Sequence, residues 1–117
     1  MEEKSIFEIQ ASLCRSMSNP TRIEIIHILR RGPECVSEIA SQCGQGQGVV
    51  SSHLRVLSSS GIIISQHQGT HIYYQIANAK IAEICDLMRE LLLDEKARQS
   101  ELIQALRTFN LKIEKGH

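Results

Sequence analysis

Apolar residues recur along the first part of the chain at steps of three and four positions, which is the spacing of one helical face. From about 5 to 17 this stripe consists of Ile6, Ile9, Leu13 and Met17. The segment Ser18-Asn19-Pro20-Thr21 interrupts it. Asn19 can cap a new helix and Pro20 suits the first helical position. The pattern therefore predicts one helix over 5–17 and a second that runs to about Arg31.

Two short apolar stripes follow, each bounded by glycine. Gly32-Pro33 ends the second helix, because Gly tolerates a left-handed cap and Pro cannot continue the helix. The third helix, which ends at Gly44, is predicted by the stripe Val36, Ile39, Ala40 and Cys43. The fourth helix, which Gly61 closes, is predicted by the stripe Val50, Leu54 and Leu57. Two such helices joined by the tight turn Gly44-Gln45-Gly46 form a helix-turn-helix.

The pattern then changes to runs rich in β-branched and aromatic residues. The runs 62–66 and 70–76 flank His67-Gln68-Gly69 and predict a β-hairpin with Ile72, Tyr74 and Ile76 on one face. From about 79 to 109 the apolar residues return to helical spacing, which predicts a last helix with a bend near Asp94-Glu95. So long an apolar stripe needs a partner surface.

The predicted fold is mostly α with a small β-hairpin. It is a winged helix-turn-helix in which the first and last helices form a helical dimerisation layer. A length of 117 residues suits one domain. We therefore expect a single domain over 1–117, with a C-terminal helical extension over about 95–117.

Composition and charge narrow the class of protein. Hydrophobic residues make up 42% and charged residues 22%, which is typical of a globular chain. The acidic start and the lack of an apolar run of roughly 20 residues predict a cytoplasmic protein without a membrane partner. Thirteen basic and thirteen acidic side chains cancel. If nucleic acid is the partner, we expect modest affinity and a shallow salt dependence.

Four stretches in one order carry a resemblance to a known family. They are Ser-Asn-Pro-Thr-Arg-Ile at 18–23, Glu-Cys-Val-Ser-Glu-Ile-Ala at 34–40, Val-Ser-Ser-His-Leu-Arg-Val-Leu at 50–57, and Gln-Gly-Thr-His-Ile-Tyr-Tyr at 68–74. Over roughly 5–95 the chain resembles the arsenic-repressor and metallothionein-repressor (ArsR/SmtB) family. The resemblance implies a homodimeric repressor that binds double-stranded operator DNA and is released by an effector. It implies no enzyme, and no nucleophile, base and orienting group form a recognisable arrangement.

The fourth predicted helix carries the side chains suited to base edges in a major groove. These candidate DNA-binding residues are Gln47, Ser51, Ser52, His53 and Arg55. The resemblance adds Gln68 and Thr70 of the wing, near the DNA backbone. Family wings usually carry Lys or Arg where this chain has Gln66, His67 and Thr70. Gly46 likewise replaces the serine that usually caps the reading helix.

The four cysteines are candidates for an effector site. Cys35 occupies the position in the third helix where metal- and arsenic-responsive relatives place a thiolate, but Ser37 stands where the second cysteine of that pair would be. Cys14 could complete a site with Cys35, and thiolates would suit arsenite or a soft divalent metal. A redox role for Cys43 or Cys85 stays open. The alternative for Cys14, Cys43 and Cys85, favoured by their apolar stripes, is packing in the core.

The other effector sites of the family are not reproduced. The zinc site of the last helix falls at Asn78, Lys80, Leu91 and Asp94, and the paired cysteines of sulfide sensors fall at His27 and Leu93. Two other functions remain open at this point. One is a repressor that responds to no effector, and the other is a winged-helix protein-interaction module without DNA binding.

Overall fold

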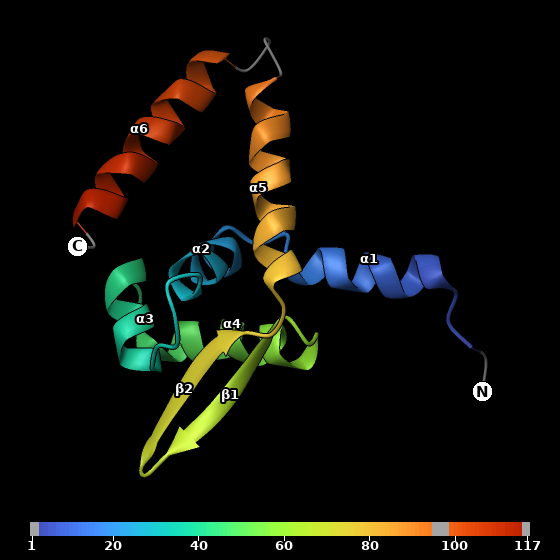
Figure 1. Cartoon of the computed structure of the whole chain (residues 1–117), viewed down its shortest axis with the longest axis vertical. Coiled ribbons are helices and arrows are strands. Elements are labelled where there is room, and N and C mark those ends of the chain that lie inside the picture. Colours follow the sequence, from blue (N-terminus) through green and yellow to red (C-terminus); the bar gives the residue numbers. More distant parts are fainter. Residues whose placement is uncertain (1–2, 95–98, 116–117) are drawn as a thin grey trace. The chain divides into compact units, whose positions relative to one another are not determined.

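The computed structural model of the chain describes residues 3–94 and 99–115 (Figure 1). Its elements, in chain order, are α1 (Ile6–Ser16), α2 (Pro20–Leu29), α3 (Val36–Cys43), α4 (Gln47–Ser59), β1 (Ile63–Gln68), β2 (His71–Ile76), α5 (Ala79–Leu93) and α6 (Gln99–Lys115). The chain divides into two compact units, 1–82 and 83–117, which are described separately. None of the described helices is long and apolar enough to cross a lipid bilayer.

The starts of α1 and α2 lie where the sequence predicts them. Ser5 caps α1 by accepting a hydrogen bond from the Glu8 amide. The Asn19 side chain accepts from the amides of Thr21 and Arg22 at 2.9 and 3.2 Å, and Pro20 is the first residue of α2. Local capping chemistry therefore sets the α1–α2 boundary.

The core of the first unit is formed by the apolar stripes of α2, α3 and α4 together with the start of β1. Its buried side chains are Met17, Ile25, Ile26, Ile28, Leu29, Ile39, Ala40, Cys43, Val50, Leu54, Leu57, Ile62 and Ile63. The predicted stripe of α4 is therefore confirmed, and that of α3 is confirmed at Ile39, Ala40 and Cys43, with Val36 half-buried. The buried Ser16 hydroxyl hydrogen-bonds the hydroxyl of Ser60, which joins the end of α1 to the end of α4.

The hairpin is antiparallel, and its turn is shorter than predicted. Ile63 pairs with Ile76 and Gln68 pairs with His71, so that only Gly69 and Thr70 connect the strands. We expected the turn at 67–69. The difference arises because Gly69, at φ +63°, supplies the positive φ that a type II′ turn needs at its first central residue.

Backbone hydrogen bonds hold the base of the hairpin against the helices. The amide of Glu34 donates to the Tyr74 carbonyl at 3.0 Å, and the Tyr74 amide donates to the Glu34 carbonyl at 2.9 Å. The Ala77 amide donates to the Ile62 carbonyl at 3.0 Å. Glu34 thus adds a single paired residue to the edge of β2, directly before α3.

The predicted long last helix is two helices. α5 ends at Leu93 and α6 begins at Gln99, and residues 95–98 lie outside the described part. In the sequence, the charged run that starts at Asp94 interrupts the apolar stripe, next to the predicted bend. In the second unit, the Arg89 guanidinium lies 4.7 Å from the centre of the Phe109 ring.

Candidate nucleic-acid interface

The turn between α3 and α4 is fixed by glycine geometry and by a tie to α2. Gly44 adopts the left-handed conformation, with φ +67°. The Gln45 amide donates to the Ala40 carbonyl at 3.1 Å, and the Gln45 side chain donates to the Thr21 hydroxyl at 2.8 Å. This turn therefore sets the direction in which α4 leaves α3.

The first turn of α4 has no side-chain cap. Gly46 stands at the N-cap and has no side chain to accept a hydrogen bond from the free amides, as its place in the sequence predicts. Free amides at a helix N-terminus favour anions such as phosphate. An exposed Gln47 is the first helical residue.

α4 is strongly two-sided. Val50, Leu54 and Leu57 are buried, whereas the candidate residues Gln47, Ser52 and Arg55 are exposed and Ser51 is half-buried. The exposed side of α4 therefore carries hydrogen-bond donors and acceptors, and the buried side packs the helix against the core.

Two valines on the outer side of α4 were missed by the sequence reasoning. Val49 is 50% exposed and Val56 is 38% exposed. The available signal was that both positions fall off the stripe of Val50, Leu54 and Leu57. Exposed apolar side chains on such a helix can contact the methyl group of thymine.

His53 has a partner inside the protein. Its Nδ1 lies 3.3 Å from Nη1 of Arg22, and Arg22 also donates to the Ser16 carbonyl at 2.7 Å and to the Arg15 carbonyl at 3.3 Å. Arg22 therefore joins the last turn of α1 to α4. The structure gives half-buried His53 a positioning role, and its contact with DNA stays a prediction.

The wing is exposed and has no Lys, Arg, Asp or Glu. Every residue from Ile64 to Ile72 is exposed, including the candidates Gln68 and Thr70. The sequence from 62 to 78 contains no Lys, Arg, Asp or Glu. In the first unit the hairpin extends away from the helices, with its turn at the free end (Figure 1). The cation on α4 is Arg55, because the remainder of 47–59 has no Lys or Arg.

The four cysteines are free thiols in different environments. Cys43 and Cys85 are buried, as the packing interpretation requires, whereas Cys14 on α1 is exposed in the single chain. Cys35 is half-buried at the N-cap of α3, with its Sγ 3.2 Å from the Ser37 hydroxyl. The hydroxyl of Ser37 and the backbone amide of Glu38 lower the pKa of the Cys35 thiol. Among the described residues, no group of three or more His, Cys, Asp or Glu side chains is arranged to hold a metal ion.

Comparisons with known proteins identify the family. Residues 19–65, which span α2 to the start of β1, match the model of the arsR family of bacterial regulatory proteins. An uncharacterised helix-turn-helix transcriptional regulator of Methanocaldococcus jannaschii, MJ1325, is 31% identical over 86 residues, which cover 73% of this chain and 97% of that protein. The chain belongs to the ArsR family of transcriptional regulators.

Other ArsR-family relatives agree with the fold and with the class of function. The SmtB transcriptional repressor of Mycobacterium tuberculosis is 30% identical over 81 residues, which cover 69% of this chain but only 60% of SmtB. A homodimeric winged helix-turn-helix DNA-binding domain of Mycobacterium bovis, a possible ArsR-family regulator, superposes with a TM-score of 0.68 at 27% identity. That match covers 82% of this chain and 93% of the domain. The predicted winged helix-turn-helix is confirmed, and the relatives are regulators rather than enzymes.

Proposed function

We propose that this ArsR-family protein is a homodimeric, sequence-specific repressor that binds double-stranded operator DNA through α4 and the wing. The observation that carries the proposal is the exposed polar side of α4, with Gln47, Ser52 and Arg55, on a helix whose opposite side is buried. A recognition helix presents its N-terminal residues to base edges in the major groove. Glutamine can pair with adenine and arginine with guanine.

Exposed apolar side chains on two helices support a homodimer. On α1 and α5 the side chains that are more than half exposed are Ile6, Phe7, Ile9, Leu87, Leu91 and Leu93. Monomeric soluble proteins rarely leave large contiguous apolar patches uncovered. A second copy of the chain would cover these surfaces. The two-fold symmetry of the resulting dimer would place two recognition helices about one DNA turn, roughly 34 Å, apart.

The distribution of charge predicts how the duplex is bound. Non-specific affinity and its salt dependence come mainly from Lys and Arg at phosphates. Because the wing has no Lys or Arg and Arg55 is the cation of α4, these two elements would neutralise few phosphates in each protomer. We expect base contacts by α4 to supply most of the preference for the operator.

Release by a thiol-reactive effector would begin at Cys35. The lowered pKa of this thiol favours the thiolate, which is the form that binds soft metals or arsenite and reacts with oxidants. Cys14, exposed on α1, is the candidate second thiolate, from the same protomer or the other one. Cys35 directly follows Glu34, whose two hydrogen bonds to Tyr74 hold the wing. A modified Cys35 would therefore act on the base of the wing.

The lack of Lys and Arg in the wing supports a second candidate function, a winged-helix module that binds protein and not DNA. Fluorescence anisotropy of the reduced protein on duplex DNA from upstream of its own gene separates the two, when repeated at two salt concentrations. Saturable binding that weakens with salt supports the repressor. No salt-sensitive binding contradicts it and favours the interaction module.

The effector is tested by repeating that titration with arsenite, zinc, lead, peroxide and persulfide. One agent should lower the affinity, and Cys35→Ser should abolish its effect while Cys43→Ser, at a buried thiol, leaves it in place. Because its pKa is lowered, Cys35 should also react with iodoacetamide at neutral pH faster than the other three thiols. Binding unaffected by every agent would contradict thiol sensing and favour a repressor that responds to no effector of this kind.

A further inference from the structure

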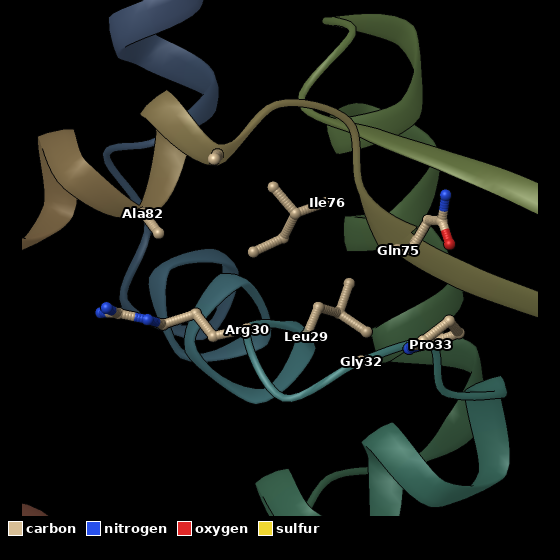
Figure 2. Close-up of a pocket in the computed structure, with 8 residues that line it drawn as sticks. Leu29, Arg30, Gly32, Pro33, Gln75, Ile76 and Ala82 are labelled. Carbon is tan, nitrogen blue, oxygen red and sulfur yellow. The ribbon is translucent and has the colours of Figure 1, made fainter.

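A pocket of about 490 Å³ lies in the first unit where four segments meet. They are the end of α2, the turn that follows it, the end of β2 and the start of α5. Its lining residues are Leu29, Arg30, Gly32, Pro33, Gln75, Ile76, Ala79 and Ala82 (Figure 2). Pockets that bind small molecules usually have volumes of about 300–1,000 Å³.

The centre of the pocket is apolar and its polar groups lie at the sides. Figure 2 shows the side chains of Leu29 and Ile76 beside each other at the centre, with the Ala82 methyl group of α5 facing them. Arg30 extends on one side and Gln75 lies on the other. Leu29 is only 2% exposed, so it forms the floor of the pocket. An apolar floor with a few polar groups at the sides is the usual composition of a ligand site.

We propose that this pocket binds a small carboxylic acid with a short aliphatic body. The body would cover Leu29 and Ile76, and the carboxylate would pair with the Arg30 guanidinium. Arg30 is the cation among the eight residues that line the pocket, and none of the eight is acidic, so the lining suits a carboxylate better than a cation. A guanidinium has five N–H donors in a planar fork, which allows it to bind a carboxylate beside another partner.

The residues that line the pocket belong to segments that also support the proposed DNA-binding surface. Gln75 and Ile76 belong to the second strand of the wing, whereas Leu29 and Arg30 end the helix that carries the tie to Gln45. A ligand wedged between them would change how the wing leaves the helices. The site itself stands independently of DNA binding, but its role as an effector site rests on the proposed function.

The site is tested without DNA, by recording the backbone amide NMR spectrum of the full chain with hexanoate and with its neutral isostere hexanamide. Millimolar hexanoate should shift the amides of Gly32, Ile76 and Ala82 in a saturable way, with hexanamide binding more weakly. The proposal is overturned if no shift saturates, or if the saturating shifts lie elsewhere in the chain.

Three variants sharpen that test. Arg30→Gln should weaken hexanoate binding about tenfold, the scale of a hydrogen bond to a charged group, and leave hexanamide binding within about twofold. Arg31→Gln, at an exposed neighbour that does not line the pocket, should leave both within about twofold. Ala82→Leu should place its larger side chain over the apolar centre of the pocket and block binding of the aliphatic body of both probes, with circular dichroism checking the fold. Equal losses of hexanoate affinity in Arg30→Gln and Arg31→Gln, or unchanged hexanoate binding in Ala82→Leu, would contradict the proposed site.

The effector role has its own measurement. Anisotropy titrations of duplex DNA with saturating hexanoate should show an affinity changed by about fivefold or more, the lower end of typical allosteric coupling. Ala82→Leu should bind the duplex with an affinity that hexanoate does not alter. An unchanged wild-type affinity at saturation would rule out the effector role, whereas absence of any duplex binding would contradict the proposed function and leave the NMR result for the site intact.

Discussion

α4 and the wing are both candidates for DNA contact, but they are held in different ways. α4 is fixed by three buried side chains, by the bond network of Arg22 and His53, and by the Gln45 tie at its start. The wing is a two-stranded hairpin, exposed from Ile64 to Ile72 and fastened only at its base. Recognition of bases needs a rigid support, whereas contact with phosphates needs charge. α4 has the support and one cation, and the wing has neither along its exposed length.

The largest effect is expected from loss of the support beneath α4. Leu54→Ala should lower the free energy of unfolding by about 2–5 kcal/mol, because it leaves a cavity under a side chain that is 1% exposed. Urea unfolding measures the change. Val56→Ala on the outer side of the same helix should cost less than about 1 kcal/mol. Similar losses of unfolding free energy in the two variants would contradict a helix with one buried and one exposed side.

Arg55 tests whether α4 reads bases or only attracts phosphates. Arg55→Ala should raise the Kd for the operator about tenfold or more, because a bidentate contact to guanine contributes about 1–3 kcal/mol. Arg55→Lys keeps the charge but loses the planar fork, so it should keep the salt dependence and lose the preference for the operator over random DNA. Full preference in Arg55→Lys would indicate a phosphate contact.

Loss of the Arg22 hydrogen bonds should lower the free energy of unfolding less than the loss of a core side chain does. Arg22→Gln removes hydrogen bonds to the carbonyls of Arg15 and Ser16 and to His53, and should lower the free energy of unfolding by about 1–2 kcal/mol. Arg15→Gln, at an exposed side chain, is the matched control and should change it by less than about 0.5 kcal/mol. Thermal unfolding of both variants measures the change. Equal stability of Arg22→Gln and the wild type would show that the hydrogen bonds of Arg22 orient His53 without stabilising the fold.

Substitutions in the wing should change duplex affinity least. Whether affinity rises or falls with the added charge tests whether the wing lies near phosphates. Gln68→Lys should raise duplex affinity about two- to fivefold and steepen the plot of log K against log salt by about one unit, as expected for one added phosphate contact. Gln68→Glu should lower affinity by a similar factor. If both variants bind as the wild type does at low salt, the wing tip does not lie near the DNA backbone.

Local rules predicted much of this fold. The cap at Asn19, the end of α3 at Gly44 and the stripe of α4 depend on residues within one or two helical turns, so their pattern is visible in the chain itself. The errors occurred where such rules compete. The hairpin turn moved to Gly69 and Thr70, because strand register decides that boundary. The predicted bend near Asp94-Glu95 lies directly after the end of α5 at Leu93, but the sequence pattern did not separate α5 from α6.

The sequence by itself determined the order of elements, the helix-turn-helix and the candidate residues of its outer face, since periodicity and motif spacing encode them. Tertiary structure alone decided that His53 has Arg22 as a partner and that Glu34 pairs with Tyr74 beside Cys35. It alone formed the pocket between α2, the wing and α5. These features join segments that are distant along the chain, and no local pattern specifies which side chains such segments bring together.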